Sequence, residues 1–111
     1  MTISINNVER DIEGYIVDPE SWNPKIACEL ASEENLNLTE DYWTVFGFMR
    51  DYWNEHRVAP DVRHVIAHMA ELKHCGKKQA KQQVFKLFPY GYVKQACKLA
   101  GMQRPRAWST G

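Results

Sequence analysis

The spacing of apolar residues predicts a mostly helical chain. Four stretches repeat apolar residues at three- and four-residue intervals, the pattern of a helix with one buried face. The second stretch is apolar over more than half of its circumference, which predicts the central and most buried helix, with Thr39 as its cap. A fifth, short helix is expected between the breakers Pro89 and Gly91 and a left-handed stop at Gly101. The predicted helices cover residues 23–34, 39–57, 59–74, 77–88 and 91–101.

The first ten residues show a different pattern. Ile3-Ser4-Ile5 and Val8-Glu9-Arg10 alternate apolar and polar positions, and Asn6-Asn7 between them suits a tight turn. We therefore expect a small N-terminal β-hairpin. The predicted fold is mostly α: a single domain over residues 1–111, built as a compact orthogonal bundle of about five helices. A C-terminal arm, residues 102–111, has no helical pattern.

Charge is distributed unevenly along the 111 residues, although the net charge is zero. Residues 1–71 contain all 14 acidic residues and 5 of the 14 Lys and Arg, whereas residues 72–111 contain the other 9 and no acid. Two interpretations remain open: the basic third forms a partner-binding end, or it lies against the acidic remainder.

Composition also bears on where the protein works. We expect no membrane segment, because no apolar run approaches about 20 residues, and no signal peptide is recognised at the N-terminus. Three widely spaced cysteines do not form a disulfide framework. A reducing, cytoplasmic setting is the expectation.

Cys97 is the candidate reactive residue. In the fifth predicted helix it shares one face with Val93, Ala96 and Ala100, and Lys94 and Lys98 flank it. This pattern predicts a thiol at the rim between the last helix and the arm, with nearby cations favouring the thiolate, so that Cys97 reacts faster than Cys28 and Cys75. The other interpretation is a small apolar residue packed in the core.

Other chemistry receives less support. His64 and His68 lie one turn apart on a predicted helix, but a complete tetrahedral ligand set is lacking, so we expect no metal and no other cofactor. A basic helix beginning at Lys77, or a helix-turn-helix around His56–Pro60, would contact phosphates. We expect weak, salt-sensitive binding to nucleic acid at most.

The ordered motifs resemble the DsrC/TusE family, the sulfur-trafficking partners of dissimilatory sulfite reductase and of the tRNA-thiolation relay. The resemblance extends over essentially the whole chain. It is strongest at the C-terminus, and the matching residues are Leu87-Phe88-Pro89, Gly91, Lys94-Gln95-Ala96-Cys97-Lys98, Ala100-Gly101 and Pro105. Upstream, the matching residues are Gly14-Tyr15, Trp22, Trp43, Phe48-Met49-Arg50-Asp51-Tyr52 and Ala59-Pro60.

The resemblance implies a sulfur carrier rather than a stand-alone enzyme, with Cys97 as the persulfide-carrying catalytic residue. It implies protein partners: a sulfurtransferase complex as donor, and a tRNA-thiolating enzyme or a sulfite reductase as acceptor. The residues predicted to bind the partner are Lys94, Lys98, Arg104, Arg106 and Trp108.

Trp108 is also the main departure from the family pattern. It stands where the family has a second, penultimate cysteine, eleven positions beyond Cys97, and the arm contains no cysteine. The alternative is therefore a regulatory or binding paralogue, with a protein or DNA partner, that keeps the fold without running the relay.

Overall fold

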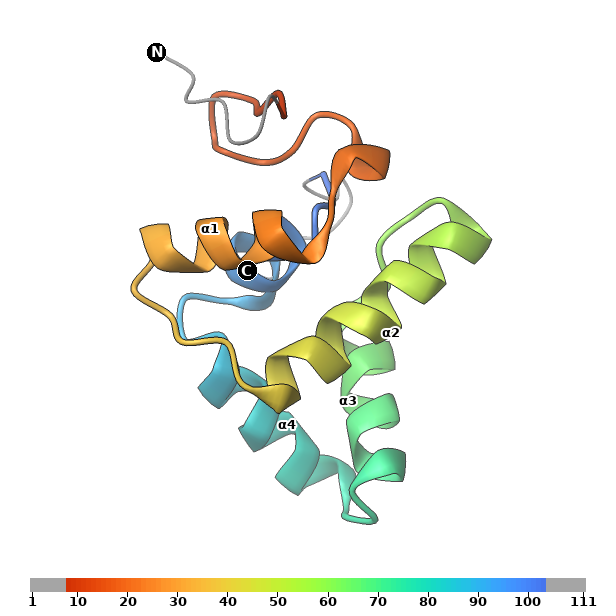
Figure 1. The fold of residues 1–111 in the computed structure, drawn as a ribbon. Coiled ribbons are helices and arrows are strands. Elements are labelled where there is room, and N and C mark those ends of the chain that lie inside the picture. The colour runs from red at the N-terminus through yellow and green to blue at the C-terminus, as the bar shows by residue number, and fades with distance from the viewer. Residues whose placement is uncertain (1–7, 104–111) are drawn as a thin grey trace.

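The computed structural model describes residues 8–103, and the elements in this range are helical. A 3-10 turn (Pro19–Ser21) precedes α1 (Pro24–Glu33), α2 (Glu40–His56), α3 (Val62–Leu72) and α4 (Lys77–Leu87), and a π-helix (Tyr92–Cys97) follows. In Figure 1, α2 runs diagonally across the molecule, α3 and α4 pair at the lower end, and the chain then returns towards α1. The prediction of a compact, mostly α bundle of five helices is confirmed.

The predicted helix starts are found within three residues. The Asn23 side chain accepts from the Ile26 N–H at 3.1 Å, and Asp61 accepts from the N–H groups of Arg63 and His64 at 3.0 and 3.2 Å. Thr39 occupies the N-cap position of α2, but its side chain makes no capping bond. Two acids in the first turn, Glu40 and Asp41, complement the helix dipole there instead.

The most buried element is the C-terminal π-helix, so the prediction that α2 would be the most buried helix is wrong. Five of the six π-helix residues are buried: Tyr92, Val93, Gln95, Ala96 and Cys97. α2 buries only Tyr42, Val45, Phe46 and Met49 among its 17 residues. Its other large apolar side chains, including Trp43 and Phe48, lie at the edge of the core, so its wide apolar face is only partly covered.

The N-terminal β-hairpin is not found among residues 8–103, and its first strand falls on residues 1–7, outside the described range. Within the described range the chain turns at residues 11–15, where Asp11 Oδ1 accepts from the N–H groups of Glu13 and Tyr15, both at 2.9 Å. An antiparallel bridge, Arg10 to Ile16, closes this turn. Of the predicted arm, the structure describes only residues 102 and 103. In the described range, no helix has the length and apolar character needed to cross a bilayer.

Candidate functional site: the buried thiol of Cys97

Cys97 lies in the interior of the protein, with 0% of its surface exposed. The predicted face is real, because Val93, Ala96 and Ala100 are buried together with it. The predicted position at a rim is wrong. The small residues of this face pack inward, and they belong to the same core cluster as residues from α1 to α4.

Beyond the π-helix the chain stays helical through Leu99, and this helical segment ends as the sequence predicts. Gly101 adopts a positive φ of 80°, and the Met102 N–H closes the end by donating to the Cys97 carbonyl at 2.9 Å. A second reason for glycine appears in the fold: a Cβ on Gly101 would lie 2.4 Å from Cδ1 of Trp22. Position 101 therefore excludes side chains both by conformation and by lack of space.

Two side chains from distant elements hold the end of this helix, and we call them the Trp22–Arg50 clamp. The Trp22 indole N–H donates to the Leu99 carbonyl at 2.7 Å. The Arg50 guanidinium donates to the carbonyls of Ala100 at 3.0 Å and Pro19 at 2.8 Å. Its central carbon lies 4.9 Å from the Trp22 ring centroid and 5.4 Å from that of Trp53. The clamp thus satisfies the last carbonyls of the helix that seats Cys97.

The start of the same helix is held by tyrosines. The Tyr15 hydroxyl donates to the Val93 carbonyl at 3.1 Å, and the Tyr92 hydroxyl donates to the Pro60 carbonyl at 2.5 Å. Tyr92 also shares a side-chain hydrogen bond with Cys97. Tyr15, Trp22, Arg50 and Pro60 therefore converge on one short segment.

The environment of Cys97 disfavours the thiolate. Burial raises the pKa of Cys97 to about 12, and the hydrogen bond shared with Tyr92 only partly opposes this. The expectation of a thiolate stabilised by lysines is wrong for this conformation. Lys94 is exposed, and the Lys98 ammonium lies 5.3 Å from the Tyr15 ring centroid, so neither cation offsets the burial of the thiol. Arg104, Arg106 and Trp108 lie outside the described residues.

Gln95 is a residue that sequence reasoning did not assign a role. It is a polar side chain in the core, 1% exposed, and its amide donates to Glu34 Oε1 at 2.8 Å and accepts from the Tyr90 N–H at 3.0 Å. The available signal was weak: an uncharged polar residue two positions before Cys97, directly after Lys94. Gln95 ties the Cys97 helix to the end of α1.

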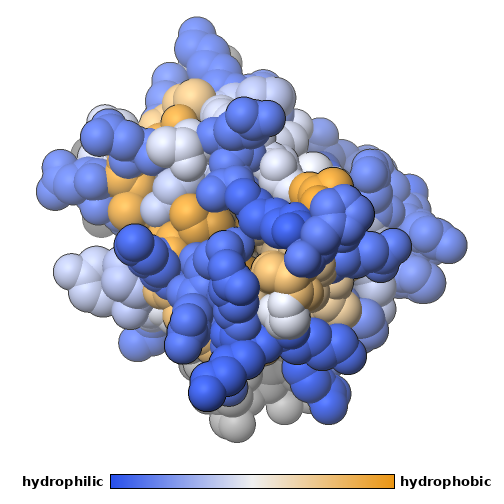
Figure 2. Space-filling model, turned by 90° about the horizontal axis from the view of Figure 1, so that it is seen from below, coloured by the Kyte–Doolittle hydropathy of each residue, from blue (hydrophilic) through white to orange (hydrophobic). Residues whose placement is uncertain are grey.

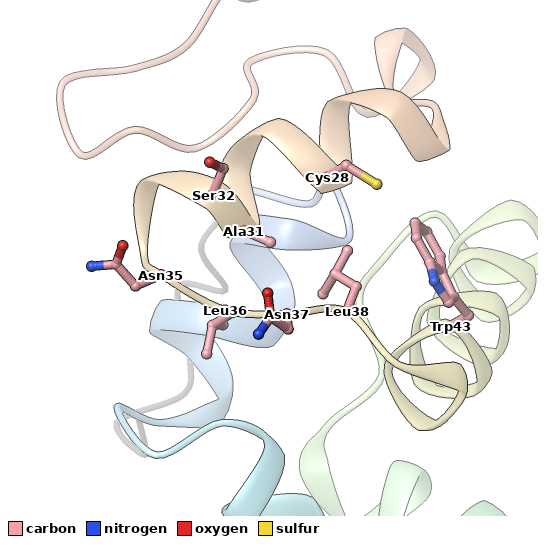
Figure 3. Close-up of a pocket in the computed structure, with 8 residues that line it drawn as sticks. All are labelled: Cys28, Ala31, Ser32, Asn35, Leu36, Asn37, Leu38 and Trp43. Carbon is pink, nitrogen blue, oxygen red and sulfur yellow. The ribbon is translucent and has the colours of Figure 1, made fainter.

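The other two cysteines are more accessible. Cys75 is half-buried and Cys28 is exposed. Cys28 lines an open groove of about 530 Å³ between α1, the α1–α2 connection and Trp43. Figure 3 shows its sulfur projecting from α1 on the side of the groove where Trp43 lies. The order of exposure is therefore the opposite of the expected order of reactivity, because Cys28 is exposed and Cys97 is buried.

The histidines on α3 contact aromatic rings. His68 stacks on Phe48 at 4.4 Å between ring centroids, and His64 lies 5.4 Å from Tyr52 with its Nδ1 3.0 Å from Asp61 Oδ1. Residues 8–103 contain no group of three His, Cys, Asp or Glu side chains arranged to hold a metal ion.

Comparison with known proteins places the chain in a family. Residues 2–107 match the family model described as DsrC like protein. Sulfurtransferase TusE of Buchnera aphidicola subsp. Acyrthosiphon pisum is 39% identical over 100 residues, which are 89% of this chain and 86% of that protein. Sulfurtransferase TusE of Escherichia coli K12 is 34% identical over 98 residues, 88% of this chain and 89% of that protein.

Solved structures of DsrC proteins support the same family assignment. The oxidized gamma-subunit of the dissimilatory sulfite reductase (DsrC) from Archaeoglobus fulgidus superimposes with a TM-score of 0.80 at 28% identity, covering 97% of this chain and 99% of that one. The DsrC of Allochromatium vinosum superimposes with a TM-score of 0.79 at 34% identity, covering 96% of each chain. With a family model matching nearly its whole length, this chain belongs to the DsrC/TusE family.

Proposed function

We propose that this protein is a sulfur-relay protein of the DsrC/TusE type, in which Cys97 carries sulfane sulfur as a persulfide. One observation supports this role for Cys97 more than any other. Tyr15, Trp22, Arg50 and Pro60, which are dispersed over the sequence, all direct hydrogen-bonding groups to the segment that holds Cys97 or to its Tyr92 partner. The relatives named sulfurtransferase TusE support the class of reaction.

The proposed transfer is a thiol–persulfide exchange. The Cys97 thiolate attacks the outer sulfur of a donor persulfide, so that a new S–S bond forms on Cys97 while the donor S–S bond breaks. The donor leaves as a thiolate and takes up the proton that Cys97 released. No external oxidant or reductant is consumed.

Because Cys97 is buried and protonated in the conformation described, transfer requires residues 92–101 to open. We propose that a docked partner stabilises this open conformation, in which hydration of the thiol returns its pKa towards that of a free cysteine, about 8.5. The clamp would then set how much free energy the opening needs.

The proposed partners are proteins of a sulfur-transfer pathway: a sulfurtransferase complex as donor, and a tRNA-thiolating enzyme or a sulfite reductase as acceptor. Lys94, Lys98, Arg104, Arg106 and Trp108 are the proposed contact residues, and the exposure of Lys94 supports its part in this set. Trp108 stands where a second cysteine would, so the proposed relay uses one thiol. We place it in a reducing, cytoplasmic setting, where free thiols persist.

The test is persulfide loading of a Cys28→Ser, Cys75→Ser chain, in which Cys97 is the only thiol. We expect glutathione persulfide to add about 32 Da, one sulfur atom, to intact Cys97. A parallel sample with N-ethylmaleimide shows when the thiol has become accessible. If Cys97 is alkylated completely but never gains sulfur, the relay role is excluded and the binding-module alternative replaces it.

A further inference from the structure

The solvent-facing side of α4 combines positive charge with an exposed aromatic ring. Lys78, Lys81, Gln82 and Phe85 are spaced by three and four residues, so they form one stripe along the helix. The opposite side buries Ala80 and Val84 in the core. Phe85 remains 39% exposed, and the Lys81 ammonium lies 6.0 Å from the centroid of its ring.

The charge of this stripe is not neutralised by neighbouring acids. α4 contains four lysines, which are Lys77, Lys78, Lys81 and Lys86, and no acidic residue. Within residues 8–103, none of these four lysines forms an ion pair with a carboxylate. Figure 2 views the end of the molecule where α3 and α4 lie, and hydrophilic side chains cover most of it, with small apolar patches between them. A surface of this composition attracts a polyanion.

We propose that the α4 stripe binds a single-stranded segment of RNA. Lysines contact phosphates, while an exposed ring provides a face on which an unpaired base stacks. Phe85 supplies that face. An acidic protein surface would satisfy the lysines but would leave the stacking face of Phe85 without a specific role.

Gln82 favours RNA over single-stranded DNA. Its amide both donates and accepts hydrogen bonds, and it lies one turn from Lys78 and from Phe85 on the same stripe. A 2′-hydroxyl, which RNA has and DNA lacks, can form hydrogen bonds with such a group. The stripe lies on a different element from Cys97, so binding here does not depend on the sulfur chemistry proposed above.

The test uses a fluorescein-labelled 12-nucleotide oligouridylate and fluorescence polarisation. With four phosphates neutralised, affinity should fall about 50-fold between about 50 and 200 mM salt. Lys78→Gln with Lys81→Gln should reduce the salt dependence to about half. Phe85→Leu, which keeps an apolar side chain but loses the ring, should weaken binding at least about fivefold without changing the salt dependence.

Matched variants complete the test. Phe85→Trp should restore binding, and Gln82→Ala should reduce the preference for the RNA oligomer over its deoxy counterpart. Lys25→Gln removes an exposed lysine on α1 and should leave binding unchanged. The proposal is overturned if Phe85→Leu binds as the native chain does, or if duplex DNA or polyglutamate of equal charge binds as tightly. Persulfide loading of Cys97 is also measured on the Phe85→Leu variant. This measurement separates a failure of the RNA-binding proposal from a failure of the proposed sulfur relay.

Discussion

Cys97 and Cys28 are chemically the same side chain in opposite surroundings. Cys97 is enclosed by the core, with its pKa raised to about 12 by burial. Cys28 is exposed on the wall of an open groove. The family motif surrounds the inaccessible cysteine, whereas the accessible one lies outside it. The comparison teaches that, in this fold, the motif builds a closed site whose opening must be controlled, rather than a thiol that is always reactive.

The largest expected difference is in alkylation rate. At pH 8 a thiol of pKa about 12 is ionised in roughly one molecule in 10⁴, against about a quarter for an ordinary free thiol of pKa about 8.5. Exclusion from solvent slows the alkylation of Cys97 further. Timed alkylation of the native protein with peptide mapping should show Cys28 modified faster than Cys97 by a factor on the order of 10³ or more. Comparable rates would mean that the closed conformation is not the dominant one.

Adding one methyl group to the closed site should have the next largest effect. Gly101→Ala combines a left-handed backbone with a clash against Trp22, and it should lower the free energy of unfolding by about 2 to 4 kcal/mol in urea titrations. Gly47→Ala is the matched control, because a Cβ there meets nothing within 4 Å and position 47 is inside α2. It should raise the free energy of unfolding by up to about 1 kcal/mol. Equal effects of the two changes would contradict the geometry at Gly101.

Weakening the Trp22–Arg50 clamp should reduce the difference in alkylation rate between Cys97 and Cys28. Arg50→Lys keeps the charge but loses the forked geometry that reaches both Ala100 and Pro19, and should lower the free energy of unfolding by about 2 kcal/mol. Alkylation of Cys97 should become faster while that of Cys28 does not change. Arg63→Lys, on an exposed arginine, should alter stability by less than about 0.5 kcal/mol. An unchanged Cys97 rate in Arg50→Lys would show that the clamp does not control opening.

The smallest expected effect is on the pH dependence of stability. An unfolded Cys97 loses its proton near the ordinary value of 9.0, whereas the folded thiol keeps it up to about 12. The unfolded state therefore binds fewer protons above pH 9, and stability falls as pH rises, by about 1 kcal/mol at pH 10. Cys97→Ala should lack this decline when denaturant unfolding is followed from pH 8 to pH 10. Parallel pH profiles for the two proteins would show that the folded thiol ionises normally.

The helices were predictable because their signals are local. Asn23 and Asp61 cap α1 and α3 through bonds to residues two or three positions away, and the face of Val93, Ala96 and Cys97 follows from helical periodicity alone. The turn predicted at Asn6-Asn7 lies outside the described residues. The turn that the structure describes is built by Asp11, whose side chain accepts from backbone N–H groups two and four positions later.

By itself, the sequence determined the helical periods, the stop at Gly101, the separation of charge and the family motif around Cys97. Only the tertiary structure decided that this face packs inward and that Cys97 is protonated there. Burial and pKa depend on which surfaces cover a residue. The covering groups of Cys97 come from positions as distant as Tyr15, Trp22 and Arg50, which no local window of sequence brings together.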